Sequence, residues 1–325
     1  MIYIEHQSLD PFFWFGLERD LLLGKDLPED VFLLWHTEPT LMLGRYQNAR
    51  AEIDEEYAKK RGIHVVRRLT GGGAIYTDPG SWQFSFIKRE QDKQINFAAF
   101  VQPVLEGLRQ MGLDVQMSAR NDLLIDGRKF SGNAQYHYGG RVLHHGSILF
   151  DTDIEEMARA LTVDGEKLNL KGIRSVRQRV TNLREHLGED MDTLGFGERL
   201  LEKLLPPDAK RRVLEPGDVQ RIEREHASMF RSWDWVFGKS PEYQVVKSKR
   251  LPGGKVEVRL NVTDGVIMEC GIAGDFFYAG DIDAVTGSLK GCRYDRERIF
   301  EALSKVTWDR SFYQIDLDEL IECIV

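Results

Sequence analysis

Residues 67–87 read RRLTGGGAIYTDPGSWQFSFI, and the fold class is best approached from this stretch. Three consecutive glycines, Gly71 to Gly73, must form a loop because glycine favours neither helix nor strand. Beyond them, apolar Trp82, Phe84 and Phe86 alternate with polar residues, which is the pattern of a half-buried strand. The sequence Asp78-Pro79-Gly80 before this strand predicts a hairpin turn.

The residues on either side of this stretch alternate between helix and strand patterns. Asp10-Pro11 provides an N-cap and a proline at the first helical position, and the helix that follows is expected to end at Gly24. Asp126-Gly127 is a strong signal for a two-residue hairpin. Further strands are expected over residues 31–36, 40–44, 63–69 and 142–150, and helices over 54–61, 95–112, 153–161 and 198–230, the last broken at Pro206-Pro207 and Pro216-Gly217. The pattern therefore predicts an α+β fold.

The pattern changes from about Trp233 onward. Three strands are expected over residues 243–250, 255–262 and 266–272, with glycine-containing turns between them and two short helices after them. A chain of 325 residues also exceeds what one hydrophobic core usually organises. We therefore predict two domains, residues 1–240 and a small α+β unit of residues 241–325, with a boundary between residues 235 and 245.

Composition excludes several classes of protein. The three cysteines, Cys270, Cys292 and Cys323, form no CxxC pair, so neither a disulfide framework nor a zinc ribbon is indicated. A net charge of -8 argues against binding to nucleic acid. No apolar run approaches the roughly 20 residues that span a bilayer, so we expect a soluble, cytoplasmic protein without a membrane partner.

One local run of positive charge stands out in this acidic chain. Residues 167–179 contain five cations and no acidic residue. Charge alone leaves two interpretations open, a solvated helix face and a local anion-binding site.

The triple glycine is a candidate ligand-binding loop, because its backbone amides can approach a ligand without obstruction. It matches neither the GxGxxG nor the GxxxxGK[ST] fingerprint, and a tight connection is the plain alternative. Arg68, a possible bidentate donor to phosphate or carboxylate, strengthens the binding interpretation. We expect Arg67 and Arg68 not to face inward together, since they are neighbours on one strand.

A second group of candidates surrounds the predicted hairpin at Asp126-Gly127. Lys129 directly follows this turn and could reach into a cleft, although an exposed strand lysine is the plain alternative. Asp122 could hold Mg²⁺ beside ATP or could cap a turn. His145 follows another histidine without the spacing of a metal site, so we interpret it as a hydrogen-bonding wall residue.

These segments together resemble the lipoate-protein ligase family. The resemblance is carried by four ordered blocks, RRLTGGGAIYTDPGSWQFSF, NDLLIDGRKFSGNAQ, HHGSILF and KGIRSVRQRVTNL, and by the tail from WDWVFGKSPEY to GDFFYAGDI. The first three blocks occur more loosely across the biotin and lipoyl ligase superfamily. The resemblance implies a catalytic domain with a mixed or antiparallel sheet, a lipoate tunnel, a mobile adenylate-binding loop and a small C-terminal domain that swings between two half-reactions.

The resemblance also implies roles for individual residues. Lys129 is expected to be the catalytic residue that touches both the acid and the adenylate phosphate, and Arg68 to contact the nucleotide. Residues 171–183 would form the adenylate-binding loop. The other residues expected to bind acid or nucleotide are Gly71, Gly72, Gly73, Ala74, Ile75, Tyr76, Asn121, Asp122, Gly132, His145, Lys171, Arg174 and Arg177.

The expected reaction uses ATP and Mg²⁺ to convert lipoate to lipoyl-AMP with release of pyrophosphate. The lipoyl group then passes to a lysine of a lipoyl-domain carrier, either a 2-oxoacid dehydrogenase acyltransferase subunit or the glycine-cleavage carrier protein. Transferases that use a thioester are disfavoured, because the first 269 residues contain no cysteine.

Two alternative activities stay open. One is a lipoyltransferase that uses preformed lipoyl-AMP without efficient ATP activation, and the other is a non-catalytic sensor built on the same fold. Biotin is disfavoured as the acid because the GRGRxGR signature is missing. Octanoate stays open, since a tunnel separates modest apolar differences by only about 1–3 kcal/mol.

Overall fold

The largest element of the computed structural model is a mixed sheet of eight strands. The structure describes residues 1–24, 29–47, 49–90, 94–161, 176–237, 245–263, 265–306 and 312–325. The order across the sheet is β11-β1-β2-β6-β10-β9-β8-β7, parallel from β11 to β2 and antiparallel from β2 to β7. The strands are β1 (Ile2–Glu5), β2 (Val31–Trp35), β6 (Ser81–Arg89), β7 (Val115–Met117), β8 (Asp122–Ile125), β9 (Arg128–Tyr138), β10 (Arg141–Leu149) and β11 (Lys210–Val213). The predicted α+β class is confirmed.

A second sheet of three short strands carries the glycine loop. Its order is β4 (His64–Arg67), β3 (Thr40–Leu43) and β5 (Ile75–Thr77). The predicted hairpin at Asp78-Pro79-Gly80 is wrong, because β5 pairs with β3 whereas β6 belongs to the large sheet. The Asp78 carboxylate accepts bonds from the backbone N–H groups of Gly80 and Asp153. These bonds turn the chain from one sheet into the other.

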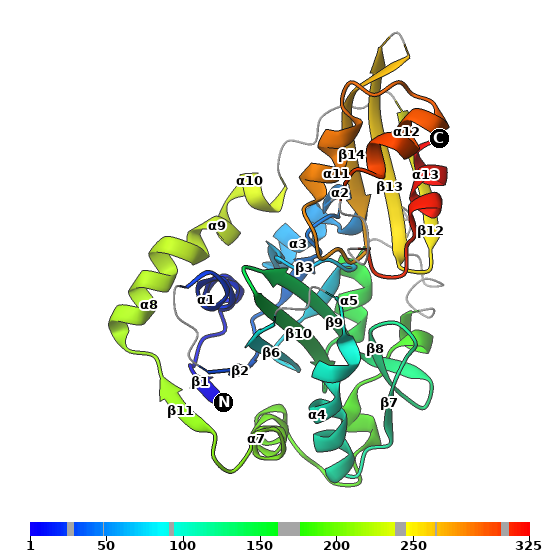
Figure 1. The fold of residues 1–325 in the computed structure, drawn as a ribbon. Coiled ribbons are helices and arrows are strands. Elements are labelled where there is room, and N and C mark those ends of the chain that lie inside the picture. Colours follow the sequence, from blue (N-terminus) through cyan, green and yellow to red (C-terminus); the bar gives the residue numbers. More distant parts are fainter. Residues whose placement is uncertain are drawn as a thin grey trace.

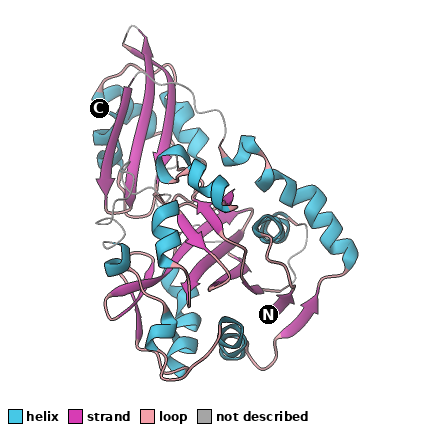
Figure 2. Cartoon of the chain, turned by 180° about the vertical axis from the view of Figure 1, so that it is seen from behind, coloured by secondary structure: helices cyan, strands magenta, loops and turns pink. Residues whose placement is uncertain are grey.

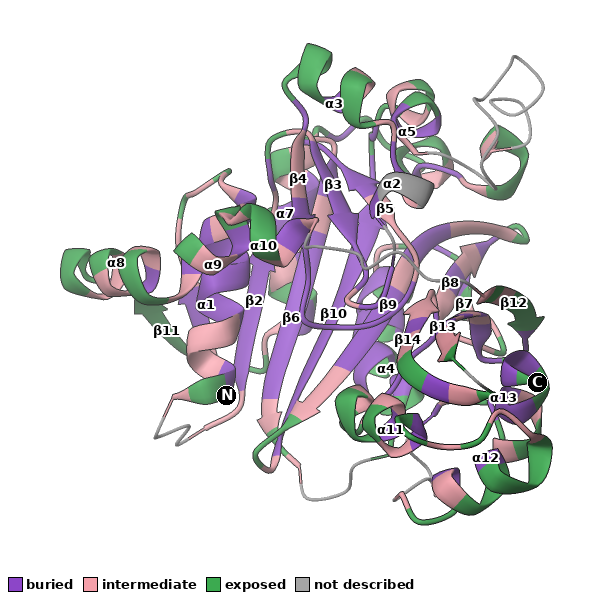
Figure 3. Ribbon diagram, turned by 90° about the horizontal axis from the view of Figure 1, so that it is seen from above, coloured by how far each residue is buried: buried purple, intermediate pink, exposed green. Residues whose placement is uncertain are grey.

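Helices cover both faces of the large sheet (Figure 1). Alternate β2 and β6 residues such as Phe32 and Phe84 pack with α4 (Phe97–Gln110) and α7 (Thr193–Leu204). The residues between them, such as Leu33, pack on the other face with α1 (Pro11–Leu23) and the small sheet. Figure 3 shows the central strands β2, β6 and β10 as buried along most of their length. Strands buried on both faces leave room for a site only where side chains are small or polar.

Capping residues place the helix ends where the sequence predicts them. The Asp10 side chain accepts from the Phe12 N–H at the start of α1, and Gly24 ends this helix. Asp54 caps α3 (Glu55–Arg61), which stops at Gly62 in the left-handed conformation. Other helical segments in the described residues before 237 include α2 (Ala49–Glu52), α5 (Ile154–Ala160), η1 (Leu183–His186), α8 (Pro216–Ile222), η2 (Glu223–Ala227), α9 (Ser228–Arg231) and α10 (Trp233–Val236). No described helix is both long enough and apolar enough to cross a bilayer.

The C-terminal unit has its own sheet and core (Figure 2). Its antiparallel strands are β12 (Val245–Leu251), β13 (Gly254–Thr263) and β14 (Val266–Gly274). The described residues hold three helices after them, not two as predicted: α11 (Ile282–Leu289), α12 (Arg296–Leu303) and α13 (Leu317–Ile324). The predicted boundary between residues 240 and 241 lies outside the described residues and stays a prediction.

Strand β11 is a segment that sequence patterning misses. It reads KRRV, all four residues are exposed, and it pairs in parallel with β1 at the edge of the large sheet. An exposed edge strand has no buried face and so shows no alternation of apolar residues. The predicted break at Pro216-Gly217 is instead the first turn of α8, where proline is favoured.

Candidate active site

The glycine loop, residues Thr70–Gly73, lies against the loop that follows β3. The Arg45 N–H donates to the Thr70 carbonyl at 2.8 Å. A Cβ on Gly44 would lie 1.8 Å from the Gly72 carbonyl oxygen, so glycine is required there for close packing. Gly72 itself has φ of +90°, which L-residues rarely adopt. The glycines therefore allow the backbone of the glycine loop to pack closely against the loop that follows β3, beside the pocket described below.

Both arginines before this loop are buried, so our expectation that they would not face inward together is wrong. The Arg67 guanidinium turns to one side, where it donates to the carbonyls of Gly44 and Gln47 and of Val236. Arg68 turns to the other side, where Nη2 donates to the carbonyls of Gly71 at 2.9 Å and Gly73 at 2.7 Å. Burial lowers the pKa of each guanidinium to about 10. The hydrogen bonds to backbone carbonyls offset the cost of burying these two charged guanidinium groups.

A chain of hydrogen bonds links Arg68 to a buried carboxylate. Arg68 Nε donates to Thr70 Oγ1 at 3.0 Å, and Thr70 Oγ1 lies 2.8 Å from His145 Nε2. His145 Nδ1 lies 3.0 Å from Glu18 Oε1, which also accepts from the Ser85 hydroxyl. Nδ1 of His145 thus faces the Glu18 carboxylate, and Nε2 faces the Thr70 hydroxyl. These contacts hold the His145 ring in place and join it to the glycine loop.

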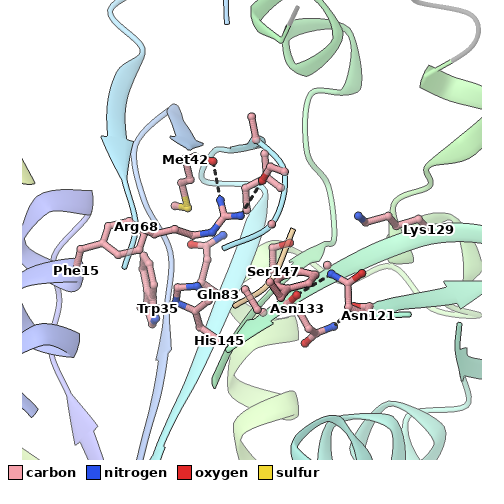
Figure 4. A pocket seen from close by; sticks show the side chains of 18 residues that line it. Phe15, Trp35, Met42, Arg68, Gln83, Asn121, Lys129, Asn133, His145 and Ser147 are labelled. Atoms are coloured by element: carbon pink, nitrogen blue, oxygen red, sulfur yellow. Dashed lines mark hydrogen bonds between the residues drawn. The ribbon is translucent and has the colours of Figure 1, made fainter. Parts of the chain in front are cut away.

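A narrow pocket of about 90 Å³ runs beside this chain (Figure 4). Phe15, Trp35 and His145 lie at one end of it, and Asn121 and Lys129 lie at the other. Trp35, Gln83 and Ser147 stand opposite one another on β2, β6 and β10 and form one row of its wall. The pocket thus has aromatic side chains together with Arg68, Gln83 and His145 at one end, and Asn121 and Lys129 at the other.

Lys129 stands at the polar end of the narrow pocket. The predicted hairpin is confirmed, since Asp126 and Gly127 have φ of 50° and 72° between β8 and β9. Lys129 Nζ forms an ion pair with Asp122 Oδ1 at 2.7 Å. A Cβ on Gly132 would lie 3.1 Å from Nζ, so this glycine leaves room for the ammonium group. The lysine is about a third exposed and is therefore accessible to a ligand.

A wide pocket of about 550 Å³ adjoins the narrow one. The two pockets share five residues, Ala74, Ile75, Lys129, Gly132 and Ser147. Apolar side chains such as Leu124, Met157 and Leu161 line the wide pocket together with polar ones such as Asp122 and Arg179. The shared residues mark the place where two ligands could meet, and Lys129 is the charged group there.

Both parts of the chain match models of known protein families. Residues 10–205 match the family model described as lipoyl protein ligase A/B catalytic domain, and residues 240–324 match bacterial lipoate protein ligase C-terminus. The chain is 37% identical to lipoate-protein ligase LplJ of Bacillus subtilis, with all of both chains covered. It is 32% identical to lipoate-protein ligase 1 of Staphylococcus aureus, with 99% of each chain covered. The chain belongs to the lipoate-protein ligase family.

Solved structures agree with this membership of the ligase family at the level of fold. Plasmodium falciparum LipL1, solved in complex with lipoate, covers 99% of this chain and 97% of its own, with a TM-score of 0.79 at 23% identity. Lipoate-protein ligase A bound with ATP covers 73% of this chain and 98% of its own, with a TM-score of 0.62 at 22% identity. The predicted ligase-like mixed sheet is thus confirmed.

The structure brings most of the site residues that the sequence predicts in this ligase to the two pockets. Those that line the narrow pocket are Arg68, Gly72, Gly73, Ala74, Ile75, Asn121, Lys129, Gly132 and His145. Tyr76 and Asp122 line the wide pocket, whereas Gly71 packs against the C-terminal unit. Arg177 pairs with Glu155, and Lys171 and Arg174 lie outside the described residues. Their roles in binding stay predictions.

Sequence reasoning missed several pocket residues of the ligase. Trp35 and Gln83 lie in ordinary strand patterns, and Glu18 lies in a helix whose pattern gives no sign of a buried carboxylate. Phe277 comes from the C-terminal unit, where it is 1% exposed and packs on Phe97. Only a hydrophobic stretch broken by one charged residue, as in FFWFGLE, could have drawn attention to Glu18.

Proposed function

We propose that this protein is an ATP-dependent lipoate-protein ligase. It condenses lipoate with ATP to lipoyl-AMP and pyrophosphate, and it then transfers the lipoyl group to a lysine of a lipoyl-domain protein. The observation that carries the proposal is the position of Lys129, whose side chain lines both pockets at their junction.

Each pocket suits one substrate. The narrow pocket suits the acid, with its chain toward Phe15 and Trp35 and its carboxylate toward Lys129. The wide pocket suits the nucleotide, because apolar residues such as Leu124 and Met157 offer a surface for the base. The relatives named for lipoate and for ATP support this assignment.

The first step joins two anions, so charge repulsion is its main obstacle. A carboxylate oxygen attacks the α-phosphorus of ATP, the bond to the β-phosphate oxygen breaks, and pyrophosphate leaves with the electron pair. The ammonium of Lys129 lies between the two sites and offsets the charge that gathers on the phosphate oxygens. The ammonium donates to the Asp122 carboxylate, and this ion pair holds it at the junction.

The residues present also fit a magnesium ion carried by ATP. Mg²⁺ in such sites binds phosphate oxygens and one or two carboxylates. Asp122 lines the wide pocket beside Lys129 and is the carboxylate that would reach it. No cluster of three or more metal-binding side chains occurs in the described part of the chain. The ion would therefore come with the nucleotide and neutralise part of its charge.

The second step is an acyl transfer without a protein thiol. The neutral amine of the acceptor lysine attacks the activated carbonyl carbon, and AMP leaves with the bonding electrons while the amine loses a proton. The chain's cysteines are unsuited to intervene, since all three lie in the C-terminal unit and burial raises the pKa of Cys270 to about 12. Direct transfer from the adenylate follows.

The acceptor that we propose is a lipoyl-domain protein of a 2-oxoacid dehydrogenase or of the glycine-cleavage system. A bipartite ligase from Thermoplasma acidophilum, described together with its E2 lipoyl domain, has a similar fold, with a TM-score of 0.64 at 24% identity. We place the reaction in the cytoplasm because all three cysteines are free, as in a reducing compartment.

The test is lipoate-dependent exchange of labelled pyrophosphate into ATP with Mg²⁺ and no carrier. The wild type should exchange, and Lys129→Ala should reduce the rate by about 10²–10³-fold. Lys305→Ala, an exposed lysine on the C-terminal unit, is the matched control and should exchange normally. If the wild type fails to exchange but transfers added lipoyl-AMP to a carrier, the protein is a transferase and the ATP-dependent assignment is wrong.

A further inference from the structure

Gln83 is a polar side chain in the wall of the narrow pocket to which no role has been given above. It is 3% exposed and lies on β6 between Trp35 of β2 and Ser147 of β10 (Figure 4). Ser147 belongs to the junction with the wide pocket, and Trp35 belongs to the aromatic end. Gln83 therefore stands along the acyl path, away from the reacting carboxylate.

The hydrogen bonds of Ser81 fix the orientation of the Gln83 amide. The Ser81 hydroxyl donates to the Asp78 carbonyl at 2.9 Å, so its single proton is already used. Its oxygen lies 3.1 Å from the terminal amide of Gln83 and can only accept from it. The amide atom at Ser81 is thus the donor Nε2, and the remaining atom is the acceptor Oε1.

Oε1 of Gln83 meets no hydrogen-bond donor among the residues that the structure describes. Two of its neighbours in the pocket wall have committed their protons elsewhere. The Trp35 indole N–H donates to Ser85 Oγ at 3.0 Å, and the His145 ring is held between Glu18 and Thr70. A buried acceptor without a donor calls for one, and a ligand in the pocket that Gln83 lines could supply it.

The candidate acids differ in what they offer to such an acceptor. The cyclic disulfide of lipoate and the plain chain of octanoate carry no N–H, O–H or S–H on the acyl part. The reduced, dithiol form of lipoate carries two S–H groups, which are weak donors. A ligand that displaces water from Oε1 without replacing its hydrogen bond loses affinity.

We propose that Gln83 is a specificity-determining residue that favours the dithiol form of lipoate over its disulfide form and over octanoate. This inference rests on the proposed function, because it takes the narrow pocket to be the acid site. It involves binding only, and no bond in the acid is made or broken at Gln83.

Anaerobic calorimetric titration of the full chain with dihydrolipoate, lipoate and octanoate tests the inference. The wild type should bind dihydrolipoate about 2- to 3-fold more tightly than lipoate, which is the lower end of the range for one net hydrogen bond, because S–H is a weak donor. Gln83→Met keeps the length of the side chain but removes the acceptor, so the two dissociation constants should become equal. Gln116→Met, the same change at an exposed glutamine of β7 outside the pocket, is the matched control and should keep the wild-type ratio.

Opposite results overturn the inference. If the wild type binds lipoate as tightly as dihydrolipoate, the ligand does not donate a hydrogen bond to Oε1 of Gln83. An unchanged ratio in Gln83→Met would show that another group discriminates. If Gln83→Met does not fold, Gln83→Leu provides the same test, and the wild-type ratio needs no variant. Absence of binding for all three acids, together with absence of pyrophosphate exchange, would instead refute the proposed function.

Discussion

The backbone N–H of Gly72 donates to the carbonyl of Phe276 at 3.2 Å, which joins the C-terminal unit to the glycine loop. The contact is extended by the Phe276 ring, which stacks on Tyr46 with centroids 4.9 Å apart. Arg120 adds a bond of 3.1 Å to the Asp275 carbonyl. In this arrangement one amide of the glycine loop is already occupied. We therefore predict that docking of the C-terminal unit is coupled to ligand binding at that amide.

Gly71→Ala should loosen this docking. A Cβ on Gly71 would lie 2.4 Å from the Phe276 carbonyl oxygen, and overpacking of this kind costs about 1–3 kcal/mol. Small-angle scattering should show a larger radius of gyration for the variant than for the wild type. Gly188→Ala is the control, because a Cβ there meets nothing within 4 Å. A scattering curve of Gly71→Ala identical to that of the wild type would argue against the coupling.

Asp122→Asn should change the magnesium requirement of pyrophosphate exchange. The variant removes the carboxylate beside Lys129 at the wide pocket. We expect the Mg²⁺ concentration for half-maximal exchange to rise by about tenfold, which corresponds to about 1.4 kcal/mol. The KM for lipoate should change less than the Mg²⁺ requirement, because the amide oxygen of the new side chain can still accept a hydrogen bond from Lys129. Asp126→Asn in the same hairpin is the control, and an unaltered Mg²⁺ curve in Asp122→Asn would contradict the assignment.

Acid should destabilise the protein through His144. This ring is fully buried and stacks on Phe100 with centroids 5.0 Å apart, and burial holds its pKa well below the ordinary value of 6.5. Below about pH 6.5 this histidine therefore binds a proton in the unfolded chain but stays neutral in the folded one. The contribution of His144 to the free energy of unfolding is complete above that pH, and it falls below it by about 1.4 kcal/mol per pH unit.

Urea denaturation at pH 7.5 and at pH 5.5 measures this effect. His144→Gln should be less stable than the wild type at pH 7.5, because it loses ring packing and the bond of 3.1 Å to Gln135. Its free energy of unfolding should then fall less on acidification than that of the wild type. Equal losses in the two proteins would mean that other groups, and not His144, cause the acid sensitivity.

Local signals explain which parts of the fold could be predicted. Asp10, Gly62 and Asp126-Gly127 act through the backbone conformation of their own neighbours, and each element that they predict is present. The turn at Asp78-Pro79-Gly80 was misjudged because pairing of β5 with β3 depends on residues far away in the sequence. Strand β11 was missed for the same reason, since its partner β1 lies about two hundred residues earlier.

The site residues also fall into those that the local sequence predicts and those that it does not. Lys129 and the glycine loop belong to short sequence motifs, and both line the pockets. Glu18, Gln83 and Phe277 reach the narrow pocket or its hydrogen-bond network only through packing of distant elements. The sequence alone cannot show that Oε1 of Gln83 lacks a hydrogen-bond donor, because this depends on how the strands pack together.

Arg67 should prove a structural residue, in contrast to its neighbour Arg68. Its guanidinium donates to Gly44, Arg45 and Gln47 of one loop and to Trp235 and Val236 at the end of the N-terminal unit. Because the loop that it binds contains Tyr46, the C-terminal unit depends on the same anchor.

Arg67→Met keeps much of the apolar stem and removes all of these bonds. Several buried carbonyls would lose their donor, so the free energy of unfolding should fall by about 3–5 kcal/mol in urea titrations followed by tryptophan fluorescence. Arg224→Met, which breaks an exposed pair with Glu225, should cost no more than about 1 kcal/mol. Similar losses in both variants would mean that water replaces the guanidinium and that Arg67 does not hold the two units together.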